Sequence, residues 1–77
     1  MNSIQDTLLY ILKAIITPND EIVVETNEVD GVLLLEISAP TELTGQIIGK
    51  EGKIIKAIRA ILTLTYPQTR FSLEIKN

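Results

Sequence analysis

The chain of 77 residues contains no cysteine and no histidine. Disulfide bonds, thiolate metal sites and catalysis by a thiol or an imidazole are therefore excluded. A chain of this length suffices for one small domain, which buries only about 60% of the surface that its unfolded form exposes. Its stability must come from an aliphatic core, with self-association as a further source.

Aromatic residues and long apolar runs are also scarce. Aromatic residues make up 4% of the chain and apolar residues of all kinds 45%, which is typical of a compact domain built on aliphatic side chains. The longest apolar run falls far short of the ~18 residues that cross a bilayer. The apolar segment at residues 11–16 has neither a basic region before it nor a cleavage site after it. We therefore expect a single cytoplasmic domain over residues 1–77.

No grouping of polar side chains predicts an enzyme. Ser3, Ser38 and Ser72 lie in no nucleophile motif. The carboxylates are scattered over predicted strands, turns and helix starts, with no spacing that brings two onto one functional face. We expect no catalytic activity, no metal or other cofactor, and no small-molecule substrate.

Positive charge is limited as well, and it is concentrated in one segment. The whole chain has a net charge of −3, from seven basic and ten acidic residues. Residues 49–59 hold four of the basic residues and one acidic residue, a local balance of +3, while the rest of the chain has a balance of −6. Because a local basic stripe matters more for phosphate binding than the net charge does, this segment is the candidate for an anionic partner.

Residues 3–18 are predicted to form an amphipathic helix. The apolar residues that fall on one face at helical spacing are Ile4, Leu8, Ile11, Leu12 and Ile15. Leu9 and Ile16 widen this face, which is typical of a helix that is buried against two surfaces or engaged in a dimer. Ser3 is a candidate N-cap, and Pro18 is expected to stop the helix.

Residues 21–38 are predicted to form a β-hairpin. Asp30 and Gly31 are a strong signal for a type I′ turn, in which both central residues take positive φ. The residues that alternation places together on one face of the second strand are Leu33, Leu35 and Ile37.

Two helices and a last strand follow. The helices are predicted at residues 41–48 and 53–64, with Thr41 as the N-cap of the first and Gly45 as a close-packing site inside it. The residues expected to face inward from the second helix are Ile54, Ile58, Ile61 and Leu62. The strand is predicted at residues 70–76 and buries Phe71, Leu73 and Ile75. Three strands with three helices on one face, an α+β fold, is the economical packing.

Gly49 and Gly52 interrupt what would otherwise be one long helix. A connection of four residues between two helices needs unusual backbone geometry, which glycine supplies without a Cβ penalty. The absence of side chains at both positions is also expected to let a ligand backbone approach closely. The connection lies at the N-terminus of the second helix, where unpaired N–H groups and the helix dipole favour an anion, and Lys50 and Lys53 add positive charge there.

The segment IGKEGKIIKAI, residues 48–58, resembles the I-G-x-x-G-x-x-I-k-x-I signature of KH (hnRNP K homology) domains. The order helix, strand, strand, helix, helix, strand is similar to the bacterial type II arrangement, and the length is similar to that of the small stand-alone KhpA proteins. The resemblance covers essentially the whole chain. It implies a type II KH fold with a three-stranded mixed sheet, in which the second and last strands are parallel neighbours, and three helices on one face.

The resemblance also implies that the partner is single-stranded RNA. KH domains clamp about four nucleotides of backbone with the glycine loop, and the bases splay into an adjacent apolar groove. By position, Gly49, Lys50, Glu51 and Gly52 would form the clamp. The other expected RNA contacts are Ile47, Ile48 and Ile55 in the groove and Lys53, Lys56 and Arg59 on phosphates. The expected role is post-transcriptional regulation or RNA and ribosome maturation.

Other interpretations of the same residues stay open. Ile47, Ile48 and Ile55 suit plain core packing as well as a groove, and the basic residues suit a solvated helix face. Glu51 places a negative charge inside the expected clamp, and no aromatic residue is predicted near it to stack bases. The alternative function is a KH-fold module for protein interaction. The resemblance further implies a homodimer, or a heterodimer with a larger KH-containing protein, and no membrane partner.

Overall fold

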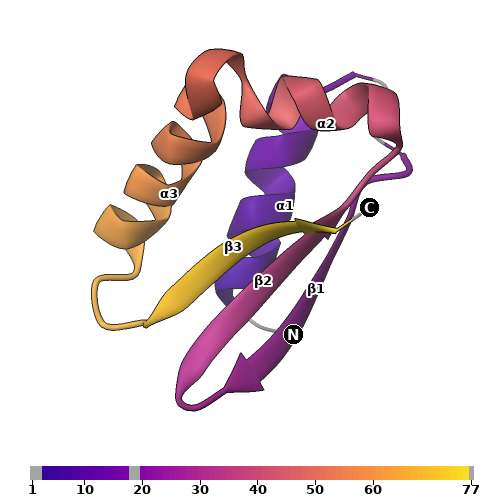
Figure 1. Ribbon diagram of the computed structural model, residues 1–77. Coiled ribbons are helices and arrows are strands. Elements are labelled where there is room, and N and C mark those ends of the chain that lie inside the picture. Colours follow the sequence, from indigo (N-terminus) through magenta and orange to yellow (C-terminus); the bar gives the residue numbers. More distant parts are fainter. Residues whose placement is uncertain (1–2, 18–19, 77) are drawn as a thin grey trace.

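The computed structural model describes residues 3–17 and 20–76. The elements in chain order are α1 (Ser3–Ile15), β1 (Val23–Val29), β2 (Val32–Ser38), α2 (Thr41–Ile48), a short 3₁₀ turn η1 (Lys50–Gly52), α3 (Lys53–Thr65) and β3 (Phe71–Lys76) (Figure 1). This order confirms the one predicted from the sequence. None of the helices in the described part of the chain is long and apolar enough to cross a membrane.

The three strands form one mixed sheet in the order β1-β2-β3. β1 and β2 are antiparallel and joined by the predicted turn, in which Asp30 has φ 53° and Gly31 has φ 78°. β3 pairs with β2 in parallel, with Leu33 opposite Phe71. The type I′ turn predicted from the Asp30-Gly31 pair is therefore confirmed. The mixed sheet that the resemblance implies is confirmed as well.

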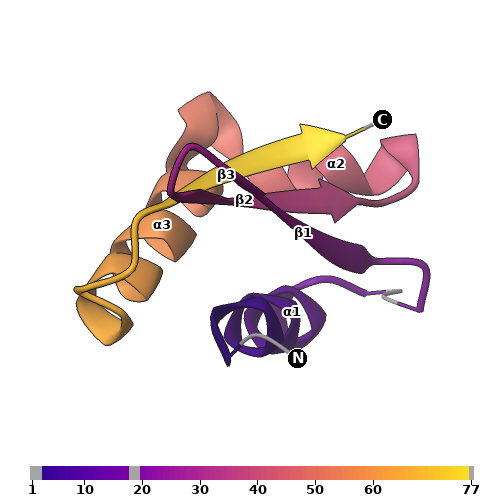
Figure 2. The same ribbon diagram turned by 90° about the horizontal axis from the view of Figure 1, so that it is seen from below.

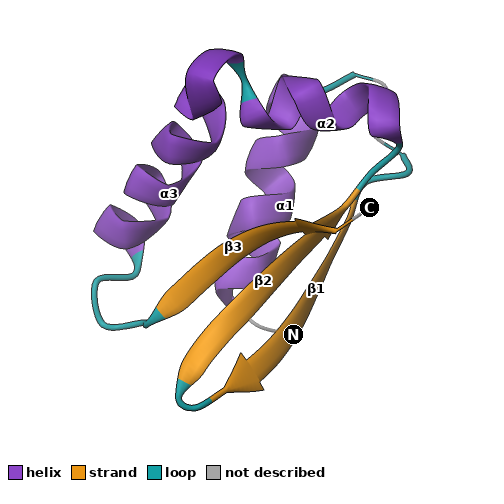
Figure 3. Ribbon diagram, in the orientation of Figure 1, coloured by secondary structure: helices purple, strands orange, loops and turns teal. Residues whose placement is uncertain are grey.

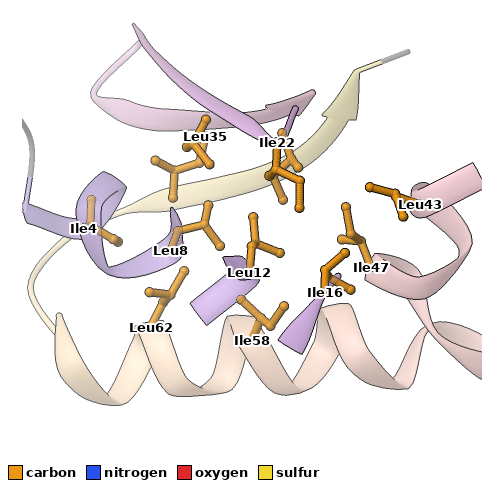
Figure 4. Close-up of a cluster of buried hydrophobic side chains, with 12 residues drawn as sticks. Ile4, Leu8, Leu12, Ile16, Ile22, Leu35, Leu43, Ile47, Ile58 and Leu62 are labelled. Carbon is orange, nitrogen blue, oxygen red and sulfur yellow. The ribbon is translucent and has the colours of Figure 1, made fainter. Parts of the chain in front are cut away.

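The helices pack on one face of the sheet, and the other face is left open (Figures 2 and 3). Side chains from all three helices and from β1 and β2 meet in one aliphatic core (Figure 4). The buried residues of this core are Ile4, Leu8, Leu12, Ile16, Ile22, Val24, Leu35, Ile37, Leu43, Ile47, Ile58 and Leu62. The hydrophobic residues of β3 are half-buried at its margin. The predicted α+β fold, consistent with a type II KH domain, is the fold observed.

The sequence prediction assigned too wide a buried face to two helices. In α1 the buried residues recur every fourth position, and Ile16, just after the end of the helix, continues this buried line, while Ile15, about 100° away round the helix, is 50% exposed. In α3, Ile54 and Ile61 were expected to face inward but are 38% and 46% exposed. The reason is that a single sheet face covers only one narrow line of each helix.

Two predicted caps are also corrected. α2 already begins at Thr41, and Pro40 is its N-cap residue with no side-chain capping hydrogen bond. Ser3 is the first residue of α1 rather than its cap, and the residue before it lies outside the described residues, as does Pro18. Proline at an N-cap cannot accept a backbone hydrogen bond through its side chain, so α2 starts without this stabilisation.

Tyr66 fixes the end of α3 to the start of α1. Its hydroxyl donates a hydrogen bond to the Ser3 carbonyl oxygen, 3.0 Å away, and also lies within hydrogen-bonding distance of the Thr7 hydroxyl. At the same helix, the Gln5 amide donates to the Val24 carbonyl oxygen of β1 at 2.7 Å. α1 is therefore held to the end of α3 and to the sheet by polar contacts as well as by its core residues.

Gly45 does not have the close-packing role predicted for it, because a Cβ added there would meet nothing within 4 Å. We expect Gly45→Ala to raise the free energy of unfolding by about 0.5–1 kcal/mol, since alanine restricts the unfolded chain and favours the helix. Urea denaturation measures this change. Gly31→Ala is the matched control: its Cβ would also meet nothing within 4 Å, but its φ of 78° should make the same substitution destabilising by about 1–2 kcal/mol. A loss of stability in Gly45→Ala would contradict the conclusion that Gly45 is not closely packed.

Candidate nucleic-acid interface

The connection between α2 and α3 is a tight turn held by its own backbone. The Gly49 N–H donates to the Gly45 carbonyl oxygen at 2.9 Å and closes α2. The Gly52 N–H donates to the Gly49 carbonyl oxygen at 3.1 Å, within η1. Gly49 has φ 76° and ψ 173°, a region of backbone space that is essentially restricted to glycine. The turn therefore requires glycine at position 49 whatever its partner.

The two glycines differ in what surrounds them. A Cβ on Gly49 would lie 2.8 Å from the Ile54 Cβ and 2.9 Å from the Ile54 backbone nitrogen, so this side of Gly49 is already filled by α3. A Cβ on Gly52 would meet only the Lys56 Cε at 3.7 Å and the Ile55 Cγ2 at 4.0 Å. The expectation of open space at both glycines is thus correct only for Gly52. Gly49 sets the approach of α3, and Gly52 leaves the backbone accessible.

Glu51 adopts a left-handed conformation, with φ 57° and ψ 25°. Gly52 follows in the same region, at φ 75° and ψ 17°, and Lys53 returns to right-handed helix, at φ −66° and ψ −36°. Two N–H groups are already used inside this turn, because the Gly52 N–H donates to the Gly49 carbonyl oxygen and the Lys53 N–H donates to the Lys50 carbonyl oxygen. The Glu51 side chain is exposed, so its carboxylate is not fixed inside this turn by burial.

The start of α3 has no internal group that neutralises its positive end. Gly52 is the N-cap residue and makes no side-chain capping hydrogen bond, and the first turn of α3 contains no acidic residue. The first-turn N–H groups of a helix and the aligned peptide dipoles favour an anion at this position. Phosphate oxygens are suitable acceptors for such a site.

The structure places the predicted basic residues on one exposed stripe that turns round α3, because a spacing of three residues shifts each side chain by about 60° round the helix. Lys50 lies in η1, and Lys53, Lys56 and Arg59 follow at intervals of three along α3, all exposed. Arg59 is six residues beyond Lys53, which is about 9 Å along the helix axis. The four side chains extend the positive end of α3 into a stripe.

The three predicted groove residues differ in how far they are buried. Ile47 is fully buried, which favours the core-packing interpretation that the sequence left open. Ile48 is 40% exposed, and Ile55 is half-buried at the edge of the core. No pocket is found in the part of the chain that the structure describes.

A second surface on α3 was missed by the sequence prediction. Ile54, Ile61 and Leu64 are exposed, and Leu64 is the most exposed of them at 82%. Positions 54, 61 and 64 lie on one side of the helix, next to the buried line of Ile58 and Leu62. The signal was present in the sequence as an excess of apolar residues in this helix, but helical periodicity alone does not say which of them the sheet covers.

Comparison with known proteins identifies relatives along nearly the whole chain. A family model described as the KH domain of KhpA/KhpB matches residues 5–76. The RNA-binding protein KhpA of Treponema pallidum is 32% identical over 73 residues, which cover 92% of this chain and 91% of that protein. The RNA-binding protein KhpA of Chlamydia pneumoniae is 34% identical over 73 residues, covering 92% and 94%.

A further relative, the RNA-binding protein KhpA of Thermotoga maritima, is 34% identical over 59 residues, covering 77% of this chain and 79% of that protein. No solved structure matches the chain.

The different surroundings of the two glycines predict different costs of substitution. Gly49→Ala should destabilise the fold by more than the roughly 1–2 kcal/mol of a left-handed alanine, because its Cβ also collides with the Ile54 backbone. Gly52→Ala should cost only the conformational term, and Gly52→Asn less, since asparagine tolerates this region. Thermal unfolding followed by circular dichroism ranks the three variants. Equal losses for Gly49→Ala and Gly52→Ala would contradict the Ile54 contact.

Proposed function

Because the chain belongs to the KhpA/KhpB family of KH domains, we propose that it binds short single-stranded RNA and acts without catalysing a reaction. The relatives that cover nearly its full length are named RNA-binding proteins. The observation that carries the proposal is the start of α3, which follows the turn at Gly49–Gly52, has no side-chain capping hydrogen bond and no acidic residue in its first turn, and has open space beside Gly52. A sugar–phosphate backbone supplies the anionic oxygens for this site.

Each residue of the turn and stripe has a distinct part in this proposal. Gly52 gives the RNA backbone access, and Gly49 holds the turn against Ile54. Lys50 and Lys53 neutralise the phosphates held by the turn, and the remaining stripe residues, Lys56 and Arg59, contact those that follow. Ile48 and Ile55 form the apolar surface against which bases rest.

The same surface implies modest affinity and weak sequence discrimination. Base–aromatic stacking is worth about 1–3 kcal/mol per base, and the aromatic side chains lie elsewhere. Tyr10 is exposed on α1, Tyr66 is bonded to Ser3, and Phe71 is half-buried on β3. Glu51 adds a repulsive charge beside the phosphates. The contacts of the turn and the basic stripe recognise the RNA backbone and not the base sequence. This is consistent with a general role in post-transcriptional regulation or in RNA and ribosome maturation.

The proposal is tested by replacing both central residues of the turn. The variant Lys50→Asp/Glu51→Asp should raise the Kd for a fluorescein-labelled RNA of about eight unpaired nucleotides at least tenfold, or roughly 1.4 kcal/mol. Fluorescence anisotropy measures the Kd. Lys13→Asp, on α1, is the control: it changes the net charge by the same amount away from the turn and should leave the Kd within about twofold.

Salt dependence provides the second measurement of the same complex. The affinity of the unmodified chain should fall steeply with salt, by about 0.7 log units per phosphate contact for each log unit of salt concentration. Identical binding by the Asp/Asp variant and the unmodified chain would rule out the turn as the phosphate site.

A second candidate function, protein interaction, is favoured by the exposed apolar residues of α3. The wide face of α1 is the other predicted dimer surface, but four of its residues, Ile4, Leu8, Leu12 and Ile16, are buried within the chain itself, and Ile15 is its one member among the large exposed hydrophobic residues of the described chain. The exposed side chains of Ile54, Ile61 and Leu64 are instead available on α3. We propose that this stripe, and not α1, mediates a homodimer or pairing with another KH domain.

Substituting the exposed residues of α3 tests the dimer. Ile61→Ser/Leu64→Ser should shift the chain toward monomer in sedimentation equilibrium, by about tenfold or more in the dissociation constant, because it removes most of two exposed apolar side chains. Tyr10→Ser, which alters a residue 76% exposed on α1, is the control and should leave the dissociation constant unchanged. Association through this stripe should persist in high salt. A strictly monomeric unmodified chain would exclude the homodimer and count against this second function.

A further inference from the structure

The open face of the sheet carries three glutamates in a row. Glu25 of β1 is opposite Glu36 of β2, and Glu36 is opposite Glu74 of β3. All three side chains alternate away from the core residues of their strands, onto the face that no helix covers (Figure 2). Neighbouring strands lie about 4.8 Å apart, so the row is about 10 Å long. We call these three residues the glutamate row.

This arrangement costs stability within a single copy of the chain. Like charges directly opposite one another on neighbouring strands are destabilising. The next row toward one end of the sheet contains Val23, Ser38 and Lys76, and the next toward the other end contains Asn27, Leu34 and Ser72. Residues 14–49 contain seven acidic residues and no lysine or arginine. In the described ranges, no group of acidic residues is arranged to hold a metal ion.

The same chain carries a complementary line of charge on α3. Lys53, Lys56 and Arg59 are exposed at intervals of three and rise about 9 Å along the helix axis, close to the length of the glutamate row, while successive side chains turn by about 60° round the helix. Within one copy the two lines cannot meet, because α3 packs on the opposite face of the sheet (Figure 2). Two copies can bring them together, since each offers one line of each sign.

We propose that RNA-free copies of this chain associate through the basic side chains of α3 in one copy and the glutamate row of another. The contact is heterologous, with a different surface used on each copy, so it extends into short chains of molecules instead of closing a dimer. This inference rests on the proposed function, because RNA phosphates compete for the same lysines and arginine. RNA binding thereby releases the copies from one another.

The charges that meet in this contact set its strength and salt dependence, and all of them are exposed except that of the partly buried Glu36. Exposed ion pairs are individually weak and are screened by salt. The association is therefore weak, requires high protein concentration, and disappears near 1 M salt, where the Debye length is about 3 Å. The apolar stripe at Ile54, Ile61 and Leu64 lies on another side of α3, and association through it persists at that salt concentration.

Matched neutral variants test the contact in sedimentation velocity at low salt. Glu25→Gln/Glu36→Gln/Glu74→Gln should weaken association at least tenfold. Glu21→Gln/Glu28→Gln/Asp30→Asn removes the same three charges elsewhere and should retain it. Adding the unpaired oligoribonucleotide should dissociate the unmodified chain. The proposal would be overturned if the two triple variants had equal effects, or if the unmodified chain were monomeric at low salt. Association that persists near 1 M salt would assign the contact to the apolar stripe.

Zero-length cross-linking identifies the residues in contact. A carbodiimide joins a lysine amine to a glutamate carboxylate only where the two touch. Mixed copies with ordinary and heavy nitrogen should yield intermolecular links from Lys53 or Lys56 to Glu25, Glu36 or Glu74, and RNA should suppress them. Links to other acidic residues alone would overturn the proposal. Links between these residues that RNA fails to suppress would establish the contact between copies but count against the proposed RNA site. The experiment therefore distinguishes a failure of this inference from a failure of the proposed function.

Discussion

The contact between Gly49 and Ile54 determines the arrangement of the second half of the molecule. Because Gly49 has no side chain, the backbone nitrogen of Ile54 in α3 comes within 2.9 Å of where a Cβ would stand. This approach fixes where α3 starts and which line of it, Ile58 and Leu62, reaches the core. The uncapped start of α3, the open side of Gly52 and the direction of the basic stripe all follow from that placement.

Local signals were sufficient to predict the order and type of the elements. The Asp30-Gly31 pair specified its turn, and alternation in β2 placed Leu35 and Ile37 correctly in the core. The family resemblance added the parallel pairing of β2 and β3, which connects residues nearly forty positions apart and has no local signature. These features depend on short-range backbone preferences or on a known topology.

The errors concern features that depend on what covers a residue. Ile15 and Ile61 have the hydrophobicity of core residues, but the sheet is too narrow to reach them. A glycine inside a helix, such as Gly45, is typical of a close-packing site, yet no neighbouring atom would lie within 4 Å of a Cβ at this position. The glutamate row likewise arises only when the registers of two strand pairs are combined. The clamp residues were located in the sequence by motif, and their contacts with RNA stay a prediction.

The hydrogen bonds of Tyr66 have a consequence for shorter versions of this domain. The partners of its hydroxyl, the Ser3 carbonyl oxygen and the Thr7 hydroxyl, belong to α1, at the opposite end of the sequence. A fragment that began at β1 would keep the whole glycine turn but would strip Tyr66 of its partners and uncover Ile58 and Leu62. The far end of α3 would then fray, although every residue of the motif was intact. The smallest unit that presents the turn in its observed shape therefore includes the first helix.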